Sequence, residues 1–176
     1  MKALILGGAR SGKSRYAETR ARECISEGLT TEEKSLVYIA TGSAGDEEMA
    51  ARIKHHQLSR GDDWLLIEEP LDLAKALARV NTKKYVIVID CLTLWITNCL
   101  CDGQFDLHRK NFLASIAEHC GDVFIVSNEV GSGIVPLGEL SREFVDQSGW
   151  LNQELATLCD RVSLIVAGLP LHLKGV

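Results

Sequence analysis

The chain has 176 residues, of which 46% are hydrophobic and 24% are charged. This length fits a single globular domain spanning residues 1–176, and the apolar content excludes a disordered chain. With 19 Lys and Arg against 24 Asp and Glu, the net charge of −5 has the wrong sign for a general nucleic-acid or anionic-membrane binder. Any anionic ligand must therefore be held by a local site.

Short apolar runs alternate with helix-length segments along the chain. Continuous Val, Ile and Leu runs are typical of strands buried on both faces of a parallel sheet. In chain order the predicted strands are Lys2–Leu6, Leu36–Ala40, Trp64–Glu68, Tyr85–Asp90, Asp122–Ser127 and Val162–Ala167. The predicted helices are Lys13–Glu27, Asp46–Leu58, Leu71–Val80, Leu92–Leu100, Leu107–Cys120 and Leu140–Leu158, the last weakened by Gly149. This alternation predicts an α/β fold, a mostly parallel sheet flanked by helices.

The first predicted strand leads into a glycine-rich turn, GGARSGKS, that matches G-x-x-x-x-G-K-[ST] in full. Its residues are Gly7, Gly8, Ala9, Arg10, Ser11, Gly12, Lys13 and Ser14. A strand before this motif and a helix after it are the context in which it binds phosphate. We expect its backbone amides and Lys13 to contact phosphate oxygens, and the Ser14 hydroxyl to ligate Mg²⁺. The sequence therefore predicts a nucleotide site.

An acidic residue ends another buried strand. Asp90 follows Tyr85–Ile89, and the carboxyl end of such a strand lies beside a phosphate loop, where a carboxylate holds Mg²⁺ or its water. The alternative is an ordinary N-cap of the following helix. We favour the metal role.

Two adjacent histidines, His55 and His56, end the charged segment DEEMAARIKHH. Neighbours on a helix point about 100° apart, so the pair is poorly placed to chelate one metal. An imidazole is a competent nucleophile toward phosphorus, and at most one of the two is expected to face the nucleotide. A solvated histidine pair is the alternative that the residues alone leave open.

A second glycine-containing loop, NEVGSGIVP at 128–136, follows another predicted strand. Ligands gather at the carboxyl ends of strands in open α/β sheets, so Glu129 is a candidate to bind a substrate hydroxyl or amide. A loop without a ligand is the alternative. The N-K-x-D element of switch GTPases is absent, so the motifs by themselves indicate a nucleotide-dependent enzyme or motor.

The six cysteines have no C-x-x-C spacing, and no secretory apolar region precedes the first predicted strand. Free, mostly buried thiols in a reducing cytoplasm account for them better than disulfides or a structural metal. The apolar stretch from Tyr85 to Cys101 carries Asp90 in its interior, which is costly in lipid. We therefore expect a cytoplasmic chain without a membrane span.

Together these motifs resemble the bifunctional adenosylcobinamide kinase/adenosylcobinamide-phosphate guanylyltransferase family of cobalamin biosynthesis. The resemblance covers essentially the whole chain. The matching segments are GGARSGKS at 7–14, YIATG at 38–42, DEEMAARIKHH at 46–56, DCLTLWITN at 90–98, NEVGSGIVP at 128–136 and GWLNQELA at 149–156. Asp90 stands where some members carry glutamate, which is one methylene longer.

The resemblance implies a RecA-like P-loop NTPase fold and a two-step activity. The first step phosphorylates the aminopropanol hydroxyl of adenosylcobinamide with ATP or GTP. The second transfers GMP from GTP to that phosphate, giving adenosylcobinamide-GDP and pyrophosphate. Two alternatives remain: a P-loop kinase of a small metabolite without the guanylyl step, and a regulatory nucleotide-binding module.

The resemblance also implies residue roles. His55 is the histidine that becomes guanylylated, and Lys13 is the second catalytic residue. Ser14 and Asp90 would hold Mg²⁺. The implied nucleotide contacts are residues 7–14 together with Ala40, Thr41, Gly42, His56, Gln57, Leu58, Ser59, Glu68 and Asp90. A homo-oligomer, specifically a trimer, is implied in the same way.

Overall fold

The computed structural model of the chain describes residues 1–26, 34–42, 61 and 63–175. Within these residues, seven strands form one sheet in the order β3-β2-β4-β5-β1-β6-β7. The strands are β1 (Lys2–Gly7), β2 (Ser35–Ala40), β3 (Trp64–Glu68), β4 (Tyr85–Asp90), β5 (Asp122–Asn128), β6 (Arg161–Val166) and β7 (Leu169–Lys174). Every neighbouring pair is parallel except β6 and β7. All six predicted strands are confirmed, including the less regular WLLIE.

Strand β7 is the element that the sequence did not predict. It pairs antiparallel with β6 through a two-residue turn, Ala167-Gly168, in which both residues have positive φ, 52° and 81°. The prediction had extended the preceding strand through Ala167. The turn lacks the Asn-Gly or Asp-Gly signal of such hairpins, and Pro170 argues against a strand except at a sheet edge, where β7 lies.

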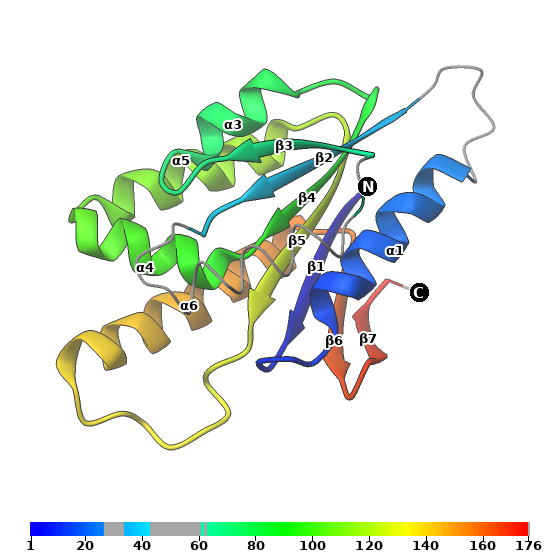
Figure 1. Cartoon of the computed structure of the whole chain (residues 1–176). Coiled ribbons are helices and arrows are strands. Elements are labelled where there is room, and N and C mark those ends of the chain that lie inside the picture. The colour runs from blue at the N-terminus through cyan, green and yellow to red at the C-terminus, as the bar shows by residue number, and fades with distance from the viewer. Residues whose placement is uncertain (27–33, 43–60, 62, 176) are drawn as a thin grey trace.

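Helices cover both faces of the sheet (Figure 1). On one face lies α1 (Lys13–Ser26), whose Ala17 and Ala21 pack on β1, β4 and β5 residues such as Val88 and Phe124. The opposite face carries α3 (Leu73–Arg79), α4 (Leu92–Asp102), α5 (Phe105–Glu118) and α6 (Glu139–Leu158). Gly149 does not interrupt α6, whose Leu151 and Leu155 are fully buried.

The predicted helix Asp46–Leu58 lies outside the described residues. The apolar stretch from Tyr85 to Cys101 forms β4 and all of α4 except its last residue, as expected for a strand followed by a helix. Trp95 of α4 is fully buried against Phe105 and Phe112, and its Nε1 donates to Leu71 O at 2.7 Å. Among the described helices, none is long and apolar enough to cross a membrane.

The cysteines differ from the expectation of mostly buried thiols. None of the six, all of which the structure describes, forms a disulfide. Cys101 and Cys120 are exposed, and Cys24 and Cys91 are half-buried. Only Cys99 and Cys159 are buried, and burial raises the pKa of each thiol to about 12.

The parallel strands place their carboxyl ends along one edge of the sheet. The glycine-rich turn follows β1, Thr41 follows β2, Cys91 follows β4 and Glu129 follows β5. Segments far apart in the sequence are therefore brought to one edge, which is where ligands bind in open α/β sheets.

Candidate active site

The glycine-rich turn forms a tight loop between β1 and α1. Arg10 and Gly12 have φ of 56° and 95°, and Ser11 N donates to Gly8 O at 3.3 Å. Successive amides in such a turn, together with the positive end of the following helix, make an anion-binding concavity. The loop that the motif predicted is therefore formed by the chain itself.

Close packing at the loop entrance requires glycine at position 7. A Cβ on Gly7 would lie 2.5 Å from Ser11 Oγ and 2.7 Å from Ile165 O on β6, both shorter than real Cβ contacts. The Ser11 Oγ is itself buried, and it has no hydrogen-bond partner among the described residues.

Lys13 opens α1 and lies across the loop. Its side chain is 8% exposed, and Nζ donates to Gly8 O at 3.0 Å. Within the described part of the chain, no carboxylate forms an ion pair with this ammonium group. A buried ammonium facing a loop of backbone amides is suited to neutralise phosphate charge.

Asp90 lies at the end of β4 in a row with Ala40 and Glu68. Ala40 pairs in register with both of them, on β4 and β3 respectively. The Tyr38 hydroxyl donates to Asp90 Oδ2 at 2.6 Å. The N-cap position of α4 is Cys91, which makes no side-chain capping bond, so Asp90 is not the N-cap that was the alternative to a metal role.

The Cys91 thiol links Asp90 with the phosphate loop electrostatically. Burial and the neighbouring Asp90 carboxylate raise the pKa of this thiol, and the Lys13 ammonium opposes part of that rise. The charges of Asp90 and Lys13 therefore both act on the Cys91 thiol. Asp90 ends β4 and Lys13 follows β1, and β5 lies between these two strands in the sheet.

Thr41 joins the ends of β2 and β4. It is fully buried, and its hydroxyl donates to Cys91 O at 2.7 Å and accepts from Cys91 N at 3.0 Å. Asn98 of α4 donates to Thr41 O at 2.9 Å and to Pro70 O at 3.1 Å. Sequence reasoning gave no role to Tyr38 or Asn98. Both lie in segments that carry the family resemblance, but a segment match does not show which strands and helices are neighbours in the fold.

The loop after β5 starts beside the phosphate loop and then extends into solvent. Asn128 N donates to Thr93 Oγ1 at 3.0 Å, and Glu129 N donates to Gly7 O at 3.1 Å. The Glu129 carboxylate accepts from Gly131 N at 2.7 Å within its own loop. Beyond it, Ile134 and Leu137 are 99% and 98% exposed.

Several predicted site residues lie outside the described part of the chain, namely His55, His56, Gln57, Leu58 and Ser59. The structure places the phosphate loop, Ala40, Thr41, Gly42, Glu68 and Asp90 at the carboxyl ends of β1, β2, β3 and β4. Glu68 is exposed, whereas Ala40, Gly42 and Asp90 are half-buried.

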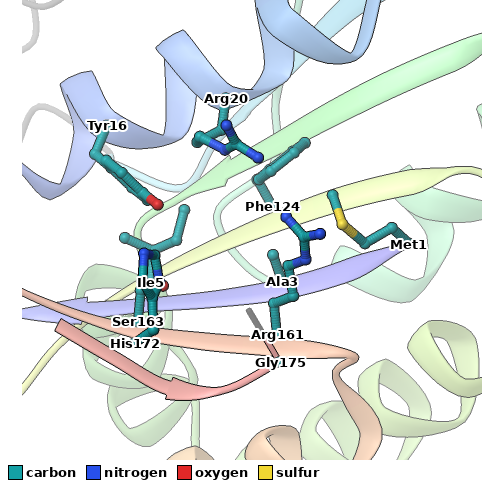
Figure 2. Close-up of a pocket in the computed structure, with 10 residues that line it drawn as sticks. All are labelled: Met1, Ala3, Ile5, Tyr16, Arg20, Phe124, Arg161, Ser163, His172 and Gly175. Atoms are coloured by element: carbon teal, nitrogen blue, oxygen red, sulfur yellow. The ribbon is translucent and has the colours of Figure 1, made fainter. Parts of the chain in front are cut away.

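A cavity of about 220 Å³ lies under α1 (Figure 2). Its lining includes Ile5 of β1, Tyr16 and Arg20 of α1, Arg161 of β6 and His172 of β7. None of the predicted nucleotide contacts within the described residues lines it, so this cavity is separate from the phosphate loop.

A phosphate loop after the first strand of a mostly parallel sheet, with an acidic residue ending a nearby strand, defines a P-loop nucleotide-binding protein. Residues 3–173 match the family described as cobinamide kinase / cobinamide phosphate guanyltransferase, and the chain belongs to this family. The resemblance seen in the sequence motifs is thereby confirmed.

Relatives of known name match over nearly their whole length. The chain is 49% identical over 178 residues to the bifunctional adenosylcobalamin biosynthesis protein CobP of Pseudomonas aeruginosa, covering 99% of this chain and 98% of that protein. It is 35% identical over 190 residues to CobU of Escherichia coli, covering 99% and 100% respectively. CobU of Salmonella typhimurium matches at the same identity and coverage.

A solved structure matches at the level of the fold. It is a KaiC-like protein from the hyperthermophilic archaeon Pyrococcus horikoshii OT3, with a TM-score of 0.53 and 13% identity over 93% of this chain and 69% of that one. The expected RecA-like α/β fold is confirmed.

Proposed function

We propose that this chain catalyses both reactions for which its family is named. It phosphorylates adenosylcobinamide with ATP or GTP, and it then transfers GMP from GTP to the new phosphate, giving adenosylcobinamide-GDP for cobalamin biosynthesis. The observation that carries the proposal is the formed phosphate loop with its buried Lys13, which forms no ion pair within the described residues, in a chain that belongs to this family.

Nucleotide binding uses the loop amides and Lys13 on the phosphates. The remaining proposed contacts are Ala40, Thr41, Gly42, His56, Gln57, Leu58, Ser59, Glu68 and Asp90. The Thr41 hydroxyl already donates to Cys91 O, and Thr41 N already donates to Asp90 O at 3.3 Å, so a Thr41 contact with the nucleotide accepts a hydrogen bond.

Mg²⁺ fits the donor atoms at this edge of the sheet. Ser14 supplies a hydroxyl and Asp90 a carboxylate, both hard oxygen donors, and both residues are partly exposed. Mg²⁺ is commonly held by one or two such groups together with substrate phosphates and waters. When bound, it would neutralise charge on the nucleotide phosphates. Asp90 is proposed as a metal ligand, and the alternative role for it is that of a base.

In the kinase step, the substrate hydroxyl oxygen attacks the γ phosphorus. A new O–P bond forms, the bond from the γ phosphorus to the bridging oxygen breaks, the nucleoside diphosphate leaves, and the hydroxyl proton passes to water. Lys13 and the loop amides stabilise the charge that spreads over the phosphoryl oxygens. His55 has no part in this step.

In the guanylyl step, an imidazole nitrogen of His55 attacks the α phosphorus of GTP. An N–P bond forms, and pyrophosphate leaves as the bond to the β phosphate breaks. A phosphate oxygen of the substrate then attacks the same phosphorus, and the N–P bond breaks to release the imidazole. Covalent catalysis of this kind divides one transfer into two.

The corrinoid is proposed to contact the loop at 128–138. This loop begins beside the phosphate loop, where Glu129 N donates to Gly7 O. Farther along, Ile134 and Leu137 are almost fully exposed and Val135 is largely exposed. Apolar side chains exposed this far are suited to cover a large apolar ligand. A cytoplasmic homo-oligomer, specifically a trimer, completes the proposal.

The test uses GTP labelled at either the α or the γ phosphorus. The protein is incubated with Mg²⁺ and labelled GTP, denatured, and assayed for bound label. The expected result is α label that is acid-labile and alkali-stable, absent from His55→Ala and present in the control His56→Ala.

The other outcomes decide between the remaining functions. Absence of α label during turnover would contradict the guanylyl mechanism. Transfer of γ label to a small metabolite, with no α label, would indicate the small-metabolite kinase. Binding of nucleotide with no transfer at all would indicate a regulatory module.

A further inference from the structure

The hairpin formed by β6 and β7 contacts the phosphate loop through its turn. Gly168 N donates to Ser11 O at 2.9 Å, so the loop carbonyl two residues before Lys13 is held by a residue more than 150 positions away in the sequence. Figure 1 shows the turn between β6 and β7 beside the loop that joins β1 to α1.

The contact is close as well as hydrogen-bonded. A Cβ on Gly12 would lie 3.3 Å from Gly168 Cα, and a Cβ on Gly7 would lie 2.7 Å from Ile165 O. Gly7 also pairs in register with Ile165 of β6. The hairpin therefore contacts the loop at its entrance and again at Ser11 and Gly12.

The turn adopts a conformation that its sequence does not favour. Ala167 carries a Cβ and has φ of 52°, in the left-handed region that disfavours side chains. Gly168, with φ of 81°, adopts the same region without a steric penalty. Residues held in such conformations persist where the surroundings determine them, and these positions cluster at functional sites.

The peptide that joins Ser11 to Gly12 connects this contact to phosphate binding. A trans peptide is planar, and its C=O and N–H point in opposite directions. Because the Ser11 carbonyl points at Gly168, the Gly12 N–H points away from the hairpin. A loop that binds phosphate through its amides needs this orientation before the ligand arrives, since preorganisation lowers the cost of binding.

We propose that Gly168 is a positioning residue for nucleotide binding: the β6–β7 turn orients the Ser11–Gly12 peptide so that the phosphate loop is formed without nucleotide. This inference rests on the proposed function, because it assigns the loop to nucleotide phosphates. The residue acts through the loop and does not itself touch the substrate.

Gly103 provides a matched control for a substitution at Gly168. It ends α4 with φ of 75°, close to the 81° of Gly168, and a Cβ at either glycine would meet no atom within 4 Å. Gly168→Val and Gly103→Val therefore impose a similar backbone strain, but only the first disturbs a contact with the loop. Asparagine tolerates the left-handed region and keeps the backbone donor, so Gly168→Asn is the conservative variant.

The experiment measures two properties of each variant. Hydrogen exchange of the amides at 7–14 is followed without nucleotide, and the Kd for Mg-GTP is measured by calorimetry. Losing one such hydrogen bond corresponds to roughly a five- to tenfold change in an equilibrium constant. We expect Gly168→Val to raise the Kd about tenfold and to speed loop exchange, Gly103→Val to change neither, and Gly168→Asn to restore both toward wild type.

Other outcomes overturn the inference. Equal changes in Gly168→Val and Gly103→Val would show that strain alone is responsible, and an unchanged Kd and unchanged loop exchange in Gly168→Val would show that the contact has no such role. If Gly168→Val fails to fold, the milder pair Gly168→Ala and Gly103→Ala decides by the same comparison. Failure of the wild-type protein to bind Mg-GTP would overturn the proposed function, and the exchange rates would still decide the role of the turn.

Discussion

The loops after β1 and β5 start side by side and differ in how they are held. The phosphate loop is fixed by Lys13 Nζ and Ser11 N on Gly8 O, by Gly168 N on Ser11 O and by Glu129 N on Gly7 O. Past Glu129, the second loop is held mainly by its own residues and by Arg142, which donates to Pro136 O at 3.4 Å. The first loop is thus held by contacts within the chain itself, whereas the second exposes apolar side chains that a ligand or partner would cover.

Lys13→Ala tests the preformed loop and has the largest expected effect. If one phosphate loop serves both transfers, both the kinase and the guanylyl activities fall by roughly 10²- to 10³-fold, the loss typical of removing one preorganised group at a developing charge. Both rates are measured with saturating nucleotide, and circular dichroism checks the fold. Loss of one activity with retention of the other would contradict a shared site.

Asp90→Asn tests the acidic residue at the same edge. We expect both activities to fall about 10- to 100-fold and the Mg²⁺ concentration for half-maximal rate to rise, because an amide is a weaker ligand than a carboxylate. Tyr38→Phe removes the hydrogen bond to Asp90 while keeping the charge, and is expected to have a smaller effect. An unchanged Mg²⁺ titration in Asp90→Asn would contradict the metal role.

A double variant, Ile134→Ser with Leu137→Ser, tests the open loop. Burying an aliphatic side chain contributes about 1.5–3 kcal/mol at most, so partial cover by the corrinoid predicts a rise in its KM of about tenfold. The Kd for Mg-GTP and the free energy of unfolding stay unchanged, since both side chains are already exposed. Leu107→Ser, on a side chain 53% exposed in α5, is the control for loss of surface apolar area. Equal KM values for the corrinoid in the double variant and the wild type would contradict a contact between this loop and the substrate.

The smallest expected effects concern the Cys91 thiol, which is half-buried beside the preformed loop. The Asp90 carboxylate raises the pKa of this thiol and Lys13 lowers it, so Asp90→Asn lowers the pKa and Lys13→Ala raises it further. At a fixed pH below the pKa, the thiolate fraction and the alkylation rate therefore increase in the first variant and decrease in the second. Mass spectrometry of the Cys91 peptide after iodoacetamide treatment measures both. Changes of the same sign would show that the two charges do not oppose one another at this thiol.

The two loops also differ in how far the sequence predicts them. The residues of the phosphate loop are adjacent in the chain, so the motif with its flanking strand and helix predicted where the loop lies, although not its contacts with Gly168 and Glu129. The six parallel strands were predicted for a similar reason, because a continuous apolar run such as Tyr85–Ile89 indicates a buried strand from its own residues alone. A resemblance over the whole chain then added a family and an activity.

Contacts between segments that are distant in the chain could not be predicted from the sequence. Gly168 belongs to an Ala-Gly turn that lacks the usual hairpin signal, so neither β7 nor the contact between Gly168 and Ser11 was predicted. Thr41 is a nucleotide contact by resemblance, and only the structure shows its hydroxyl hydrogen-bonded to Cys91, which follows the neighbouring strand β4. Such roles depend on strand order and register, which local composition does not specify.

The central claim is that this chain carries out two successive transfers on one corrinoid. The most direct measurement incubates the purified protein with adenosylcobinamide, Mg²⁺ and GTP labelled at the α or the γ phosphorus, and identifies the corrinoid products by chromatography and mass spectrometry. We predict adenosylcobinamide-GDP that carries one label from the α position and one from the γ position. A corrinoid carrying only γ label, or no labelled corrinoid at all, would contradict the account.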